Sequence, residues 1–69
     1  MEIFAQRIKL LRKEKKVGQK VIAEYLGIVL RSYQNYESGT HYPDVPKLIM
    51  LADYFGVSTD YLLGRSDQR

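Results

Sequence analysis

The sequence contains no cysteine, only one histidine and no long apolar run. Without cysteine, neither disulfide bonds nor a thiolate metal site can support the fold, and the reducing cytoplasm suits such a chain. Because His41 has no second histidine or cysteine beside it, we expect no metal site and no cofactor. No apolar stretch approaches the roughly 20 residues that cross a bilayer, and the first residues do not begin a basic leader. We therefore expect a cytoplasmic protein without a membrane segment.

Signatures of catalysis are missing as well. The sequence has no glycine-rich phosphate loop and no pair of carboxylates at a recognisable catalytic spacing. A chain of 69 residues can form one small domain, expected here over residues 1–69, with little concave volume to enclose a substrate. We expect neither an enzyme nor a small-molecule ligand.

Positive charge is concentrated near the start of the chain. The net charge is only +3, but the first twenty residues hold seven lysines and arginines against two glutamates, an excess of five. Such an excess suits a polyanion such as nucleic acid. Lysine near the end of a helix is also favoured by the helix dipole alone, so the stability explanation stays open.

The segment from residue 19 to 37, QKVIAEYLGIVLRSYQNYE, has the pattern of two short helices hinged at Gly27. A glycine allows the left-handed backbone of a tight turn, and Ala23 is small enough for the second helix to cross closely over the first. The residues expected to face inward are Ile22, Ala23, Leu26, Ile28, Tyr33 and Tyr36. This pattern predicts a helix-turn-helix over about residues 19–38, with helices at 19–26 and 30–38.

Three further helices are predicted around this motif, so the expected fold is all-α. The first runs from about residue 3 to 16, with an apolar stripe at spacings of four and three. Asp44 is expected to cap the fourth helix and Gly56 to end it, with Pro46 in its first turn. The fifth helix is expected to begin after Ser58 and to end before Gly64.

The second helix of the motif carries polar residues suited to reading DNA bases. At about 100° per residue, inward tyrosines leave Arg31, Gln34 and Asn35 pointing outward together. Arginine can donate two hydrogen bonds to guanine, and a side-chain amide can pair with adenine. The alternative is an ordinary solvated helix face.

From Phe4 to Arg65 the sequence resembles the Cro/C1-type (XRE) repressor family with the lambda-repressor-like domain. The resemblance is carried by RIKLLRKEK, by the Q...A...LG core of the turn, by YESGTHYPD and by LADYFGVSTDYLLG. It implies a compact five-helix domain whose second and third helices form the motif. It also implies a sequence-specific regulator of transcription, a repressor, that binds double-stranded DNA.

The resemblance also assigns roles to single residues. It implies that Leu30, Arg31 and Asn35 read bases, and that Gln19 touches a phosphate. It places the loop with Ser38, Thr40 and His41 close to the DNA backbone, although an ordinary polar loop remains an alternative. Apart from the resemblance, the hydroxyl of Tyr36 needs a partner, and a phosphate is one candidate. The resemblance also places Arg12 against Glu37 as an internal ion pair, the alternative being two unrelated surface charges.

Two departures from the family pattern concern the start of the recognition helix. Val29 stands at a phosphate-touching position where a serine or threonine usually caps the helix, and Gly18 replaces a capping threonine before the first motif helix. Leu30 occupies a base-reading position of the family but has no hydrogen-bonding group. Val29 and Leu30 could contact a thymine methyl group, or they could form a protein-binding patch with Val21 and Tyr25.

One recognition helix covers only a few base pairs, so we expect a homodimer on a near-palindromic operator. Tyr54, Val57 and Leu63 are the candidates for its apolar interface. The competing interpretation is a protein-interaction module, antitoxin-like or a co-regulator, that keeps the helix-turn-helix fold without specific DNA readout.

Overall fold

Five helices form the fold of residues 2–69, the part of the chain that this computed structural model describes. They are α1 (Glu2–Lys15), α2 (Gln19–Leu26), α3 (Leu30–Ser38), α4 (Val45–Phe55) and α5 (Thr59–Leu63). Residues 2–69 contain no strand, and none of their helices has the length and apolar character needed to cross a bilayer. The prediction of an all-α, five-helix domain is confirmed.

Local signals in the sequence set most helix ends. The carboxylate of Asp44 accepts a hydrogen bond of 3.0 Å from the backbone N–H of Lys47, which caps α4. The hydroxyl of Ser58 does the same for Tyr61 at 2.9 Å, which caps α5. Gly27 takes the left-handed conformation with φ +72°, and the chain turns there from α2 into α3. These caps and this turn are as predicted.

The end of α1 differs slightly from the prediction. The helix was expected to run to Lys16 but ends at Lys15, because Lys16 has a left-handed backbone with φ +58°. Its N–H still donates a 3.0 Å hydrogen bond to the carbonyl of Lys13, so the last turn closes as an ordinary helix end. At the other end, α1 begins at Glu2, one residue earlier than expected.

The core takes one fully buried side chain from every helix. Ile8, Ile22, Tyr33, Leu51 and Leu62 are completely shielded from solvent. Around them pack the remaining members of each apolar stripe, so the helix faces expected to point inward do so. Burial of these stripes is what holds a chain without disulfides together.

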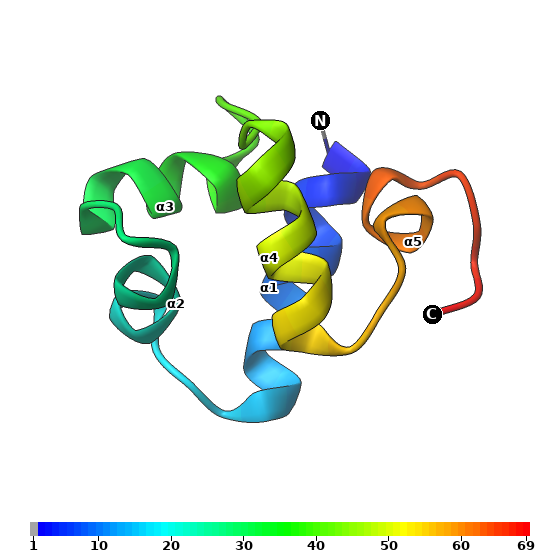
Figure 1. Ribbon diagram of the computed structural model, residues 1–69, viewed down its shortest axis with the longest axis horizontal. Coiled ribbons are helices and arrows are strands. Elements are labelled where there is room, and N and C mark those ends of the chain that lie inside the picture. The colour runs from blue at the N-terminus through cyan, green and yellow to red at the C-terminus, as the bar shows by residue number, and fades with distance from the viewer. Residues whose placement is uncertain (1) are drawn as a thin grey trace.

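The arrangement of the helices presents the motif at one edge of the molecule. α1 contacts α3, α4 and α5, and α2 contacts α3 and α4. Figure 1 shows α2 and α3 on one side, with α5 and the C-terminal segment on the other. One flank of α1 therefore borders the motif, and another borders α5 and the C-terminal segment.

Two of the three residues expected at a dimer interface are already used inside the chain. Tyr54 and Val57 are half-buried and pack against the core. The ring of Tyr54 lies 4.9 Å from that of Tyr25 and 5.3 Å from that of Phe55. Only Leu63 is exposed.

Candidate nucleic-acid interface

Arg31 and Asn35 present free polar groups on α3. They are four residues apart, which places them one turn apart on the same face of the helix. Arg31 is exposed and Asn35 is half-exposed. Among residues 2–69, neither side chain forms a hydrogen bond or an ion pair with another residue. Both remain available to an external partner.

Gln34, which the sequence grouped with them, differs because its side chain has a hydrogen-bond partner inside the molecule. Its amide Nε2 donates a 3.1 Å hydrogen bond to Oε1 of Gln19 on α2. The Nε2 of Gln19 donates in turn to Oε1 of Glu37 at 3.0 Å. The position one residue before Asn35 is rotated by about 100° on the helix, which turns Gln34 toward α2. The two glutamines thus brace α2 against α3.

Glu37 is the centre of a network that joins α1, α2 and α3. Arg12 donates to its carboxylate twice, from Nε to Oε2 at 2.6 Å and from Nη2 to Oε1 at 3.1 Å. The hydroxyl of Tyr33 donates to Oε2 at 2.5 Å, and Gln19 adds a fourth hydrogen bond. The side chain of Glu37 is only 4% exposed and that of Arg12 12%. The structure therefore brings Arg12 and Glu37 together as a nearly buried, bidentate ion pair.

The network also sets the protonation states of its members. Burial raises the pKa of Glu37, but hydrogen bonds from Arg12, Tyr33 and Gln19 outweigh burial and hold that pKa below the ordinary value of 4.5. Burial and the hydrogen bond to Glu37 raise the pKa of Tyr33 well above the ordinary 10.0. At neutral pH Glu37 is therefore ionised, and the Tyr33 hydroxyl stays protonated and donates to it.

Acid should weaken the fold through this carboxylate. Because folding lowers the pKa of Glu37, its ionised form adds stability above pH 4.5, and that stability is lost as pH falls from 4.5 through the lowered pKa. At pH values below about 4.5, we expect the melting temperature of the wild-type protein to decrease. In the Glu37→Gln variant the melting temperature should depend less on pH.

Glu14→Gln is the matched control for this measurement, because Glu14 is a half-exposed carboxylate paired with Arg69. It should leave most of the pH dependence in place. If Glu37→Gln and the wild-type protein lose the same number of degrees between pH 6 and 3, the assignment to Glu37 is wrong.

The two helices of the motif begin without side-chain caps. Gly18 and Val29 take the extended N-cap conformation at α2 and α3, but neither supplies a side-chain acceptor. In contrast, Asp44 and Ser58 cap α4 and α5. The first backbone N–H groups of α2 and α3 are therefore open to an external acceptor, and a phosphate oxygen is a suitable one.

Restoring a cap at α3 should stabilise the free protein. Val29 has φ −74° and ψ 155°, the backbone that a capping serine uses, and it is 68% exposed, so a smaller side chain leaves no cavity. We expect Val29→Ser to raise the free energy of unfolding by about 0.5 to 2 kcal/mol in a denaturant titration. Val29→Ala is the control that removes the valine without adding a hydroxyl. Equal stabilities of the serine and alanine variants would show that α3 does not begin where the structure places it.

A hollow of about 240 Å³ opens beside α3, where the chain leaves the helix toward α4. Its lining includes Asn35, Tyr36 and His41, which the sequence had singled out. Ser32 and Tyr42 also line it and were missed. The ring of Tyr42 packs edge-on against Phe4 with centroids 5.6 Å apart, which fixes the wall of the hollow.

The polar groups around this hollow are not equally available. The hydroxyl of Tyr36 has no hydrogen-bond partner within residues 2–69, and burial raises its pKa, so it stays protonated as a free donor. The hydroxyls of Ser38 and Thr40 are hydrogen-bonded to the carbonyl of Asn35, at 3.1 and 3.2 Å, and lie 2.8 Å from each other. Ser38 and Thr40 therefore stabilise the end of α3, and His41 stays exposed in the loop.

Apolar side chains accompany the polar ones at the start of α3. Val29 and Leu30 are exposed, and so are Val21 and Tyr25 on α2. The hydroxyl of Tyr25 donates to the carbonyl of Met50 at 3.0 Å, which ties this ring to α4.

Across residues 2–69 no cluster of three or more histidine, aspartate or glutamate side chains is arranged to hold a metal ion.

The helix-turn-helix geometry agrees with a family assignment. The family model described as a helix-turn-helix domain matches residues 5–67. The chain belongs to this helix-turn-helix family. The resemblance to Cro/C1-type (XRE) regulators is thereby confirmed, and the curated relatives are named as HTH-type transcriptional regulators.

Individual proteins resemble this chain in sequence or in fold. The chain is 40% identical over 65 residues to the uncharacterized HTH-type transcriptional regulator YobD of Bacillus subtilis, covering 94% of this chain and 58% of YobD. A crystal structure of a transcriptional regulator from Listeria innocua matches with a TM-score of 0.84 and 43% identity, over 88% of this chain and 57% of that one. The P22 c2 repressor, crystallised with a synthetic operator, shares the fold with a TM-score of 0.82 at 24% identity, over 90% of this chain and 94% of its own. The chain thus spans little more than half the length of YobD.

Proposed function

We propose that this chain binds double-stranded DNA sequence-specifically and regulates transcription in the cytoplasm, as a repressor, with α3 in the major groove. The observation that carries the proposal is the free pair on α3. Arg31 and Asn35 have no partner within residues 2–69, whereas Gln34 and Gln19 are engaged between α2 and α3. Arg31 suits the O6 and N7 atoms of guanine, and Asn35 suits N6 and N7 of adenine. YobD is named a transcriptional regulator, which agrees with this role.

In this proposal the open helix starts hold the DNA backbone. The free N–H groups at the beginning of α2, including that of Gln19, and those at the beginning of α3 face phosphate oxygens. The side chain of Gln19 positions α3 through Gln34 rather than reaching outward. The Tyr36 hydroxyl and His41 contact a second phosphate at the hollow.

The exposed apolar residues at the start of α3 add a different kind of readout. Val29 and Leu30 have no hydrogen-bonding side chain, and both are exposed. In the major groove, such side chains can distinguish thymine by its methyl group. We assign them to thymine methyl groups next to the base pairs that Arg31 and Asn35 read.

We further propose that two copies bind a near-palindromic operator. A single recognition helix reads too few base pairs for useful specificity, and two-fold symmetric dimers place their helices about one helical turn apart. Within residues 2–69 the surface near α5 offers only Leu63 from the expected interface. The dimer is therefore expected to form or tighten on DNA.

Selection of bound sequences from a random duplex library tests the proposal. We expect an enriched half-site that contains a guanine and an adenine, repeated with two-fold symmetry and half-site centres about 34 to 36 Å apart. Absence of any enriched sequence would contradict specific readout.

A second candidate function is a protein-interaction module, favoured by the exposed apolar side chains Val21, Tyr25 and Val29. In that case these residues would meet a partner protein, and α3 would not enter DNA. The same selection separates the two functions, because a module of this kind enriches no duplex sequence.

A further inference from the structure

The lysines and arginines of the chain fall into two groups by their partners. Six of the eleven are engaged within the molecule. The engaged residues are Arg7 with Asp67, Arg12 with Glu37, Lys47 with Asp44, Arg65 with Asp60, Arg69 with Glu14, and Lys15, whose Nζ lies 5.5 Å from the centre of the Tyr54 ring. Within residues 2–69 the other five have neither a carboxylate nor an aromatic partner: Lys9, Lys13, Lys16, Lys20 and Arg31.

Four of these free cations follow one another along the chain from α1 to the start of α2, and we name them the lysine track: Lys9, Lys13, Lys16 and Lys20. All four are exposed. Lys9 and Lys13 are four residues apart on α1 and share one flank of that helix. Lys9 lines a groove together with Ser38 and Gly39, so this flank borders the end of α3. Lys16 directly follows α1, and Lys20 is the second residue of α2.

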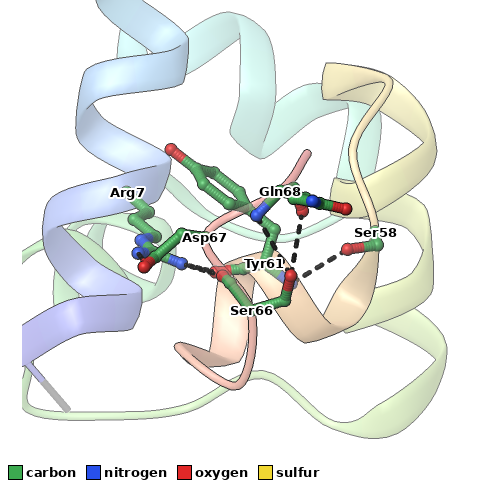
Figure 2. Close-up of polar contacts among 6 residues, drawn as sticks. All are labelled: Arg7, Ser58, Tyr61, Ser66, Asp67 and Gln68. Carbon is green, nitrogen blue, oxygen red and sulfur yellow. Dashed lines mark hydrogen bonds and ion pairs between the residues drawn. The ribbon is translucent and has the colours of Figure 1, made fainter.

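The opposite flank of α1 is covered by the chain itself. Arg7, two residues and therefore about 200° from Lys9, donates to the carbonyls of Tyr61 and Ser66 at 2.5 and 2.7 Å. Figure 2 shows its guanidinium turned toward this C-terminal segment, where it also pairs with Asp67 at 2.8 Å. Along that flank, Glu14 binds the guanidinium of Arg69 with two hydrogen bonds of 2.9 and 2.8 Å. One flank of α1 is thus neutralised. On the other flank Lys9 and Lys13 have no ion-pair partner, although the carboxylate of Glu2 lines the same groove as Lys9.

A row of unpaired lysines has the properties of a phosphate-contacting surface. Like charges repel when no partner neutralises them. Duplex DNA carries about one negative charge per 1.7 Å of its axis, so its backbone can neutralise such a row. Lysine acts as a point charge on a flexible stem, which suits contact with phosphate in any sequence. The lysine track lies next to the open N-terminus of α2, where the proposed function already places the DNA backbone.

We propose that the lysine track is a second DNA-backbone surface, which extends the contact beyond the base pairs read by α3. This inference depends on the proposed function. It predicts that the lysine track adds affinity but no sequence preference. It also predicts that flanking duplex outside the operator contributes to binding.

The test measures the association constant against salt concentration on the selected operator and on a scrambled duplex. Lys9→Gln combined with Lys13→Gln removes two charges and retains much of the apolar stem. Each removed phosphate contact should lower the magnitude of the slope of log K against log salt by about 1 per protomer. The reduction should be the same on both duplexes, so the ratio of their affinities stays constant. Lys15→Gln, on the same helix but held against Tyr54, is the matched control and should leave the slope unchanged.

The length of the duplex gives a second readout. The difference in affinity between the wild-type protein and the Lys9/Lys13 double variant should be smaller on a duplex trimmed to the selected operator than on a duplex with long flanks. If the wild-type slope is steep and the double variant keeps it, the lysine track is refuted and the proposed function stands. If the wild-type protein shows no salt-dependent binding to either duplex, both proposals fall.

Discussion

Arg12→Ala is expected to lower the free energy of unfolding by about 3 to 5 kcal/mol, because it leaves the carboxylate of Glu37 buried without its cation. The side chain of Glu37 is only 4% exposed, and Arg12 donates two of the four hydrogen bonds that its carboxylate accepts. A domain of this size has a total stability of about 5 to 15 kcal/mol, so the loss is a large part of it. Urea denaturation followed by circular dichroism measures the change.

Arg65→Ala is the control for this substitution. Arg65 lies 3.8 Å from Asp60, and both side chains are largely exposed, so its removal should cost less than about 0.5 kcal/mol. If Arg12→Ala does not fold, Glu37→Gln provides the milder variant, because it removes the buried negative charge and keeps one of the two acceptor oxygens that Tyr33 and Gln19 use. A loss below about 0.5 kcal/mol for both Arg12→Ala and Glu37→Gln would show that the network does not hold the motif in place.

DNA binding is expected to depend steeply on salt. A dimer that neutralises about 6 to 10 phosphates should lose roughly three to five orders of magnitude in affinity between 50 and 200 mM salt. The physical reason is the release of counterions from the DNA as lysines, arginines and open helix N–H groups replace them. Fluorescence anisotropy with a labelled duplex gives the association constant at each salt concentration.

The control for the salt series is Arg65→Gln, which removes a charge two residues after the end of α5. Figure 1 shows α5 on the side of the molecule away from α3. The slope of the Arg65→Gln variant should equal that of the wild-type protein. A wild-type affinity that is unmeasurable at 50 mM salt, or that does not change up to 200 mM, would contradict an interface with the DNA backbone.

The fold could be predicted from the sequence because its signals are local. Caps such as Asp44 and Ser58, and the left-handed turn at Gly27, depend on a few neighbouring residues. The apolar stripes follow the helical period, so they indicate which side of each helix is buried. Lys16 was the exception, because lysine seldom takes the left-handed conformation and nothing in its neighbours signals it.

The candidate site could be predicted only in part. Helical periodicity places Arg31, Gln34 and Asn35 within one arc, but it cannot show that Gln34 turns toward Gln19 on another helix. The hydrogen bonds from Arg7 to the C-terminal segment join residues up to about sixty positions apart. Such contacts depend on how helices pack, and that packing carries no short-range signal in the sequence. The ion pair between Arg12 and Glu37 was predicted from the family resemblance, because helical periodicity alone does not indicate it.

The central claim is that Arg31 reads a base from an exposed helix, and the most direct measurement is the affinity of Arg31→Ala for the selected operator and for a scrambled duplex at fixed salt. We expect a loss of about 1 to 3 kcal/mol on the operator, a smaller loss on the scrambled duplex, and relaxed preference at one base pair. Equal losses on both duplexes would contradict the claim, because they would reduce Arg31 to a contact with phosphate.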